Sequence, residues 1–373
     1  MRFLIISHAL HKTKDTAVFS YAPYVREMNV WLKHIDAVEV VAPLTTEIIS
    51  EIDLAYNHED LLLTEVPSIA FTSIKKTGMS VIKLPLIIFK LFKACQKAEH
   101  IHLRCPGNIG LLGCFVQLCF PKKPKTAKYA GNWDAKAKQP FSYKLQKWIL
   151  SNTFLTKNMQ VLVYGDWENQ TKNIKSFFTA TYTNSEIEIP IKRDYSGDLK
   201  FVFIGSLVEG KRPLLALQII EVLYKQGRNV FLELYGEGVL KQELQNYITT
   251  NNLEKIVSLH GNQSKNVIKE VLKTAHFSIL PSKSEGWPKA LAEGMFFGAI
   301  PIATAMSCVP YMLDFGDRGI LIEPHLHEAV DAISDALKDS DKLKSMSEEA
   351  SNWSQHFTLE SFENEIIKLL NRK

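Results

Sequence analysis

The sequence has little of several features that mark special classes of protein. Its 373 residues contain five cysteines, an odd number with no Cys-x-x-Cys pair. This excludes a disulfide scaffold and indicates free thiols in a reducing compartment. No apolar run reaches the ~20 residues that span a bilayer, because the longest, Leu84–Phe92 and Ile109–Phe120, are both interrupted. Met1–Ser7 is too short an apolar run for a signal peptide. We expect a cytoplasmic protein that at most lies on the inner face of a membrane.

A strong excess of one charge is also missing. Lysine and arginine number 44 and aspartate and glutamate 40, for a net charge of +4, which is too weak to indicate a nucleic-acid partner. Hydrophobic residues make up 46% and charged residues 23%, as in ordinary soluble globular proteins. At roughly 100–200 residues per domain, the length predicts two domains.

Short apolar strands alternate with amphipathic helical segments along the chain. In the first half we expect strands at Arg2–Ile6, Val38–Val41, His100–Leu103, Ala127–Tyr129, Val161–Val163 and Thr181–Thr183. In the second half we expect them at Phe201–Ile204, Val230–Leu234, Val257–His260, Phe277–Leu280, Ile300–Ala303 and Gly319–Ile322. Such alternation predicts parallel sheets covered by helices on both faces, and so many strands favour two doubly wound α/β domains. The charged stretch Glu188–Asp198, which contains Pro190, marks the seam between residues 1–190 and 191–355.

Ligands in open α/β sheets bind where strands end, and three post-strand loops of the second half are candidates. The first runs from Gly205 to Pro213 and carries Lys211 and Arg212 just before a helix, an arrangement suited to a diphosphate. The second contains Gly236 and Gly238, and the third His260 and Gly261. Glycine lets backbone approach a ligand closely. Each loop could equally be an ordinary turn with solvated side chains.

A fourth loop carries the strongest signal. The strand ending at Leu280 leads into a serine-rich turn with Glu285 and Gly286, and a helix with Glu293 in its second turn follows Pro288. A helix N-terminus favours a phosphate, and each carboxylate can accept two hydroxyl hydrogen bonds from a sugar or ribose. Apolar neighbours of Glu293 indicate a buried position, where an acid needs a partner.

The pattern Pro-Ser-x-x-Glu285-Gly-x₆-Glu293-Gly, followed by Gly298-Ala-Ile-Pro301, resembles the signature of family-4 retaining glycosyltransferases of the GT-B fold. The resemblance covers residues 200–325 well, while the rest agrees only in fold pattern. It implies two Rossmann-like domains facing across a cleft: an acceptor domain and a nucleotide-sugar domain. It also implies that a C-terminal helix, within residues 356–373, crosses back to join the first domain.

The resemblance implies a role for each matching residue. Glu285 would hold hydroxyls of the transferred sugar and, with Lys211, belong to the catalytic centre. Lys211 would neutralise the diphosphate of a UDP- or GDP-linked donor, and Glu293 would bind the ribose. No metal or other cofactor is expected. Further donor contacts would come from Gly205, Ser206, Arg212, Gly236, Gly238, His260, Gly261, Gly286, Trp287, Lys289 and Ala290.

Departures from the family pattern affect both halves. Ser206 stands where the family usually has arginine, so Arg212 could supply that charge, and Lys289 could compensate for Pro288, which lacks an N–H. In the first half, Asn132 or Asp134 could replace the family's catalytic histidine. His8, His102, Arg104 and Trp133 are candidates on the acceptor side; each could equally be structural.

The segment Ile74–Lys97 interleaves six lysines with apolar residues. A basic amphipathic helix of this kind can rest on anionic lipid, but it could equally be an ordinary helix covering a sheet with its lysines in water. Contact with a membrane would favour a lipid-linked acceptor.

Together these features predict a retaining glycosyltransferase that transfers a sugar from a nucleotide-sugar to a saccharide or lipid-linked acceptor, in the synthesis of a surface polysaccharide or glycoconjugate. Two alternatives stay open: a sugar-nucleotide epimerase, and a non-catalytic subunit that binds a nucleotide-sugar within a synthesis complex. Nothing indicates a nucleic-acid partner.

Overall fold

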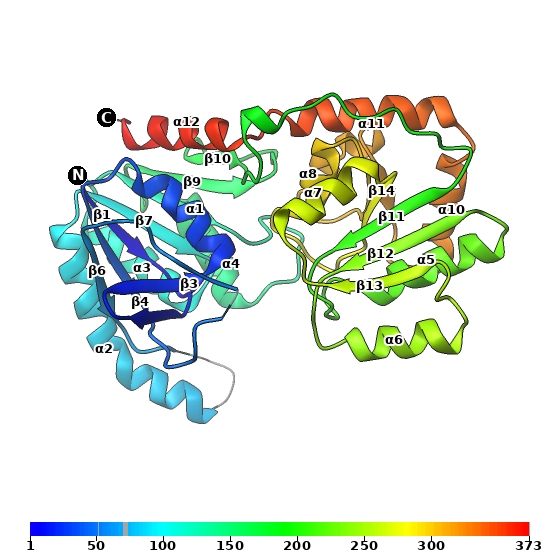
Figure 1. Ribbon diagram of the computed structural model, residues 1–373. Coiled ribbons are helices and arrows are strands. Elements are labelled where there is room, and N and C mark those ends of the chain that lie inside the picture. Colours follow the sequence, from blue (N-terminus) through cyan, green and yellow to red (C-terminus); the bar gives the residue numbers. More distant parts are fainter. Residues whose placement is uncertain (51, 70–73, 373) are drawn as a thin grey trace. The chain divides into compact units, whose positions relative to one another are not determined.

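The computed structural model describes residues 1–50, 52–69 and 74–372, and side chains in α2 are described for residue 78 and from residue 80 onward. The chain forms two compact units (Figure 1). The first comprises residues 1–177 and 363–373, and the second residues 178–362. The sequence predicted these boundaries at 190/191 and 355/356. In the structure, residues 178–190 and 356–362 belong to the second unit instead.

The first unit is built on a parallel sheet of seven strands in the order β10-β9-β8-β7-β1-β4-β6. Its strands are β1 Arg2–Ile6, β4 Ala37–Ala42, β6 Leu61–Glu65, β7 His100–Cys105, β8 Lys125–Tyr129, β9 Met159–Tyr164 and β10 Ile174–Phe177. Its helices are α1 Ala22–Leu32, α2 Ile74–Lys97, α3 Asn108–Val116, the 3₁₀ turn Gln117–Cys119 and α4 Phe141–Ser151. The chain extends the sheet from β1 to β6 on one side and then returns to build β7 to β10 on the other.

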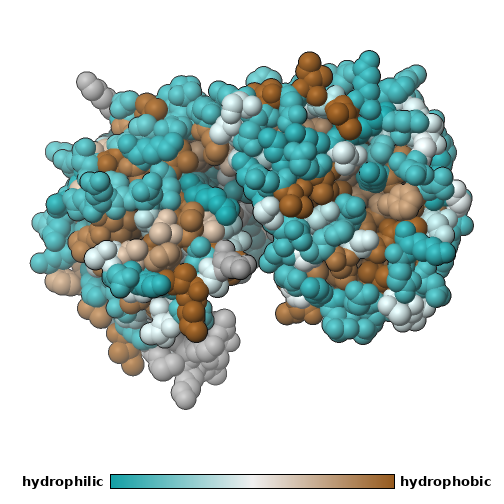
Figure 2. All heavy atoms as spheres, viewed as in Figure 1, coloured by the Kyte–Doolittle hydropathy of each residue, from teal (hydrophilic) through white to brown (hydrophobic). Residues whose placement is uncertain are grey.

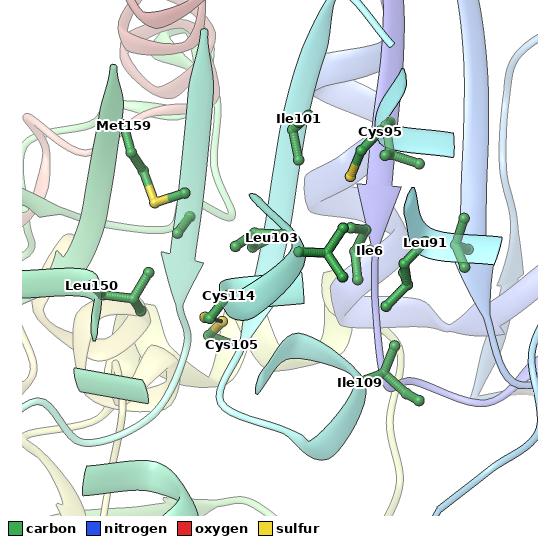
Figure 3. Close-up of a cluster of buried hydrophobic side chains, with 14 of the residues drawn as sticks. Ile6, Leu91, Cys95, Ile101, Leu103, Cys105, Ile109, Cys114, Leu150 and Met159 are labelled. Atoms are coloured by element: carbon green, nitrogen blue, oxygen red, sulfur yellow. Dashed lines mark hydrogen bonds between the residues drawn. The ribbon is translucent and has the colours of Figure 1, made fainter. Parts of the chain in front are cut away.

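Helices bury both faces of this sheet, which explains why β1 is almost continuously apolar. Leu4 and Ile6 point into a core with α2 and α3, where Ile87 and Leu91 are fully buried. Figure 3 shows Ile6 and Leu91 in this cluster, together with Cys95, Ile101, Leu103, Cys105, Ile109, Cys114, Leu150 and Met159. Phe3 points to the opposite face and stacks on Trp31 of α1. Each such burial contributes about 1.5–3 kcal/mol.

The first unit contains elements that the sequence did not predict. An antiparallel sheet in the order β2-β3-β5 joins His11–Lys14, Ala17–Tyr21 and Asp53–Ala55. The strand β6, Leu61–Glu65, was also missed. The strand expected at Thr181–Thr183 is wrong: these residues form a loop, and the last strand before the seam is β10.

The second unit is built on a six-stranded parallel sheet in the order β13-β12-β11-β14-β15-β16. Its strands are β11 Leu199–Ile204, β12 Val230–Tyr235, β13 Val257–Gly261, β14 Phe277–Leu280, β15 Ile300–Thr304 and β16 Ile320–Ile322. Its helices are α5 Pro213–Lys225, α6 Lys241–Thr250, α7 Lys265–Thr274, α8 Lys289–Phe296, α9 Val309–Met312, α10 Leu326–Ala336 and α11 Ser340–Ser354, with 3₁₀ turns at Asn184–Glu186 and Asp314–Gly316. All six expected strands are present.

The last helix, α12 Leu359–Leu370, contributes to both units. Leu359 donates its N–H to the carbonyl of Tyr182 at 2.8 Å, within the second unit. Further along, Glu363 accepts from Lys33 at 2.8 Å and pairs with His34 at 2.9 Å, within the first unit. The C-terminal helix therefore returns to the first unit, as the resemblance predicted. No described helix combines the length and apolar character needed to cross a bilayer.

Candidate functional site

The second sheet has a point where its strand order reverses. From β11 the chain adds β12 and β13 on one side, then crosses back to place β14 and β15 on the other side of β11. The loops after β11 and β14 therefore diverge from neighbouring strands, which leaves the crevice where ligands bind in open α/β sheets. Lys211 follows β11 and Glu285 follows β14, so the topology alone brings these two loops together.

Lys211 and Glu285 form an ion pair at this switch point. The Nζ atom of Lys211 lies 2.5 Å from Oε1 of Glu285, although the residues are 74 positions apart. The Glu285 side chain is only 8% exposed, whereas that of Lys211 is 30% exposed. The two loops are also joined through their backbones, because Lys283 donates its N–H to the carbonyl of Gly210 at 2.8 Å. The pair thus presents a partly exposed cation next to a buried carboxylate.

Glycines allow three loop backbones to cross closely at the same edge. A Cβ atom at Gly236 would overlap the carbonyl of Gly205, and one at Gly238 would overlap the carbonyl of Leu207. Gly236 adopts φ +145°, a conformation that L side chains rarely adopt. The crossings are fixed by hydrogen bonds from Leu207 N–H to the Glu237 carbonyl at 2.9 Å and from Gly236 N–H to the Gly261 carbonyl at 2.8 Å. Ser206 is exposed beside them.

Two buried polar atoms in these loops have no hydrogen-bond partner among the described residues. They are Nη1 of Arg212, which precedes α5 with φ +50°, and Oγ of Ser282 in the loop after β14. A buried polar group without a partner costs about 1–3 kcal/mol. Arg212 and Ser282 therefore provide hydrogen-bonding atoms at the switch point that a polar ligand can satisfy.

Side chains that the sequence analysis did not identify hold the Glu285 loop. Cys308, which follows β15, donates its thiol to the Gly286 carbonyl at 2.8 Å. Burial, and then the nearby Glu285 carboxylate, raise the Cys308 pKa to about 12, so the thiol keeps its proton. Thr304 donates to the Ser282 carbonyl at 2.5 Å. Examining every residue that follows a strand, including β15, would have identified Cys308.

Glu293 occupies a separate position in the second turn of α8, which begins at Lys289 after the N-cap residue Pro288. Its Oε1 accepts a hydrogen bond from the Thr181 hydroxyl at 2.7 Å. Glu293 is half-buried and lines a small pocket with Thr181 and Lys289. The predicted partner for this acid is therefore present, and it comes from the loop that was mistaken for a strand.

The remaining predicted donor contacts have different surroundings. His260 is exposed and its ring stacks on Tyr235, with the centroids 4.7 Å apart. Trp287 is buried and packs against Trp353, with the centroids 6.0 Å apart. Ala290, in the first turn of α8, accepts the Ser278 hydroxyl at its carbonyl. The Trp287 side chain therefore supports the loop from the core.

The first sheet has its own reversal between β1 and β7. His8 follows β1, and its ring lies where a side chain on Gly107, at the N-terminus of α3, would overlap it. Arg104, near the end of β7, donates to buried Glu27 at 3.1 Å. Desolvation, and then the Arg104 charge, lower the His8 pKa, so the imidazole is neutral at pH 7. His8 and Arg104 thus lie at a second switch point.

The other first-half candidates divide into loop and core residues. Asn132 and Asp134 are half-buried in one turn, where the Asp134 N–H donates to the Asn132 side chain at 2.8 Å. His102 is fully buried, bonds Thr126 at 2.8 Å, and burial lowers its pKa to about 3. Trp133 is 5% exposed within the core. The structure thus places His102 and Trp133 in the core, which favours the structural alternative for both residues.

Comparison with known proteins finds a family that is similar to the second unit. Residues 184–353 match the model of the family Glycosyl transferases group 1. These residues lie within the second unit, which is therefore similar to a group 1 glycosyltransferase domain. An uncharacterized glycosyltransferase of Methanocaldococcus jannaschii is 25% identical over 191 residues, which are 51% of this chain and 52% of that protein. The amylovoran biosynthesis glycosyltransferase AmsK of Erwinia amylovora is 28% identical over 141 residues, 36% of this chain and 35% of AmsK. The matches span about half of these relatives or less.

Solved structures show the fold of the whole chain. HepE from Anabaena, in complex with UDP, gives a TM-score of 0.67 at 12% identity, over 99% of this chain and 98% of HepE. WaaG, a glycosyltransferase involved in lipopolysaccharide biosynthesis, gives 0.63 at 13% identity over 100% of each chain. The chain therefore has the two-domain GT-B fold that its sequence motif predicted.

Proposed function

We propose that this chain is a retaining, metal-independent glycosyltransferase that transfers a sugar from a UDP- or GDP-linked donor to a saccharide or lipid-linked acceptor during polysaccharide or glycoconjugate synthesis. The observation that carries the proposal is the Lys211–Glu285 pair at the switch point of a group 1 domain. A nucleotide-sugar has an anionic diphosphate next to a hydroxyl-rich ring. A cation beside a carboxylate matches both parts of such a donor.

The donor loops supply complementary groups for each part of the donor. Lys211, with Arg212 and the N-terminus of α8, would bind the diphosphate, because a helix N-terminus and cations both favour phosphate. When the nucleotide-sugar binds, Lys211 would pair with its diphosphate instead of with Glu285. The Glu285 carboxylate would then be able to accept hydrogen bonds from hydroxyls of the sugar. Glu293 would bind the ribose. These cations would stabilise the negative charge that develops on the leaving diphosphate during transfer.

The acceptor would be bound by the first unit at its own switch point. His8 and Arg104 lie there, with Asn132 and Asp134 after β8. His8 is neutral at pH 7 and can accept or donate one hydrogen bond to an acceptor hydroxyl. A strong protein base is not required, because the donor phosphate itself can take the acceptor proton in a retaining transfer.

The comparisons support this choice of substrates. HepE was crystallised with UDP, AmsK is named for amylovoran biosynthesis, and WaaG is described as acting in lipopolysaccharide biosynthesis. UDP-linked sugars are therefore the first donors to test, and surface polysaccharide intermediates the first acceptors.

Calorimetric titration with UDP, GDP and their sugars, without added metal and with EDTA, tests the donor site. We expect one nucleotide to bind, and Lys211→Met to weaken it at least tenfold. The matched control is Lys225→Met, since Lys225 forms a similar 2.5 Å pair with buried Glu221 on α5, away from the switch point. Equal affinity of Lys211→Met and the unaltered protein would contradict the donor site, and a requirement for metal would contradict metal independence.

Donor turnover tests the activity itself. A labelled donor incubated with acceptor should give a product with retained anomeric configuration, as read by proton NMR. Interconversion of the donor sugar without acceptor would instead identify an epimerase. Tight donor binding without turnover, across a panel of glycan and lipid-linked acceptors, would identify a non-catalytic subunit.

A further inference from the structure

The helix α2 of the first unit has an unusual composition. Its 24 residues include six lysines and no aspartate or glutamate. Most helices that cover a sheet carry charges of both signs on their solvent face, because oppositely charged neighbours stabilise the helix. Here every charged side chain is a lysine. The side chains of residues 74–77 and 79, which include Lys75, Lys76 and Met79, lie outside the described residues, and the continuous described surface of the helix is that of residues 80–97.

One side of α2 packs against the sheet of the first unit. Ile87, Leu91, Ala94 and Cys95 are buried in its core. These four side chains cover the apolar face of the sheet on this side. The apolar residues on the other side of the helix are therefore not required for the fold.

That other side exposes large apolar residues at helical spacing. Ile82 is 81% exposed, Leu86 48% and Phe89 59%, so they form one stripe with spacings of three and four residues. Val81, Ile88 and Phe92 are also exposed. Hydrophobic residues gather over α2 at the lower left of Figure 2. Single exposed apolar residues need no explanation, but a contiguous patch marks an interaction surface.

The apolar stripe continues onto the segment after α3. Phe92 packs against Phe120, with the ring centroids 5.0 Å apart. Lys123 donates to the carbonyls of Cys95 and Gln96 at the end of α2, at 2.8 and 2.7 Å. These contacts fix residues 120–123 against the C-terminal end of the helix.

A cationic cavity opens next to this segment. Its volume is about 730 Å³, and four cations but no acidic residue line it: Lys122, Lys157, Lys172 and Arg372. Lys93 and Lys97, near the C-terminal end of α2, are also exposed. The apolar stripe therefore ends in a concentration of positive charge.

We propose that α2, with the cationic cavity at its C-terminal end, docks the first unit on an anionic lipid bilayer. An exposed apolar stripe flanked by lysines matches the boundary between acyl chains and anionic headgroups. The complementary charge excludes a neutral bilayer as the preferred surface. Cations within a Debye length, about 10 Å, of the surface contribute without touching it. The proposal is independent of the donor site, which lies in the second unit.

Flotation with vesicles of equimolar phosphatidylglycerol and phosphatidylcholine tests the role of charge. Each lysine near such a surface contributes about fivefold in affinity, so Lys93→Gln with Lys97→Gln should weaken binding at least tenfold. The matched control, Lys14→Gln with Lys255→Gln, removes two exposed lysines elsewhere and should bind like the unaltered protein. Equal binding of the two double variants would overturn the proposal, provided that their melting temperatures agree.

A second pair of variants tests the apolar stripe. Ile82→Ser with Phe89→Ser should abolish the flotation that remains at high salt, where the charge attraction is screened. The control is Ile189→Ser with Phe154→Ser, two apolar residues that are at least as exposed. Three results would overturn the proposal: no flotation of the unaltered protein, equal flotation with pure phosphatidylcholine vesicles, or a dimer in light scattering that Ile82→Ser with Phe89→Ser dissociates.

Discussion

The Lys211–Glu285 pair allows a quantitative prediction that needs no ligand. Among the described residues, Lys211 is the only hydrogen-bond donor to Glu285, whose side chain is 8% exposed. Breaking a fully buried ion pair costs about 3–5 kcal/mol, because a charge is left unpaired. Since Lys211 is 30% exposed, water reaches the site in part, and we expect Lys211→Met to lower the free energy of unfolding by about 2 kcal/mol.

The two other variants complete the cycle. Glu285→Gln leaves a lysine that can reach water, so it should cost about 1 kcal/mol. Lys211→Met combined with Glu285→Gln leaves no buried charge and should also cost about 1 kcal/mol. The loss in free energy of unfolding for the double variant should then be about 2 kcal/mol smaller than the sum of the losses for the two single variants.

Native-state hydrogen exchange of the β11 and β14 amides measures this cycle, because it reports opening of the second unit by itself. Lys225→Met is the matched control. Its partner Glu221 keeps a hydrogen bond from the Tyr247 hydroxyl at 2.6 Å, so the loss should be smaller than for Lys211→Met. Additive effects of Lys211→Met and Glu285→Gln would refute the view that Glu285 is a buried charge that depends on this lysine.

Three further changes have expected outcomes. Gly236→Ala places a Cβ atom against a neighbouring carbonyl and should cost more than about 1 kcal/mol in urea unfolding and weaken donor binding; unchanged values for both would contradict the backbone crossing. Burial favours protonation of Glu186, but hydrogen bonds from the Thr183 backbone and two lysines outweigh it and lower its pKa to about 2. Its stabilising effect is therefore present above pH 4.5 and lost as the pH falls towards about 2, so Glu186→Gln should flatten that part of the stability–pH curve, and an unchanged slope would count against this. Thr181→Val removes the hydroxyl that donates a hydrogen bond to Glu293, but it removes no residue that is proposed to contact the nucleotide-sugar. Its affinity for the nucleotide-sugar in calorimetry should therefore stay within about threefold of that of the unaltered protein, whereas Glu293→Gln should lower the affinity more.

The sequence predicted much of the second unit because local patterns determine it. Most of its strands are short apolar runs followed by a glycine or polar turn, and all six were located. Local patterns did not predict the pairing of Lys211 with Glu285, which only the family resemblance assigned to one centre, because the pairing depends on β14 lying beside β11 rather than beside β13. That strand order is a property of the whole sheet, and no local pattern encodes it.

The failures also have physical causes. The alternating Thr181–Thr183 segment has high β propensity, but β propensity is easily overridden by tertiary context, and the loop instead supplies the hydroxyl that Glu293 accepts. His102 alternates on its strand with two other polar residues, His100 and Arg104, so the sequence did not show that this face of the strand is buried. In the structure its ring packs against Trp31, with centroids 4.9 Å apart, and it belongs to the core.

Hydrogen–deuterium exchange of the full chain, with and without the nucleotide that binds in calorimetry, tests most directly where the donor binds. We predict protection in peptides that cover residues 205–213, 236–240 and 281–293, with none in the sheet of the first unit. Protection confined to other segments, or a bound nucleotide that leaves these three loops unprotected, would contradict the donor site described above.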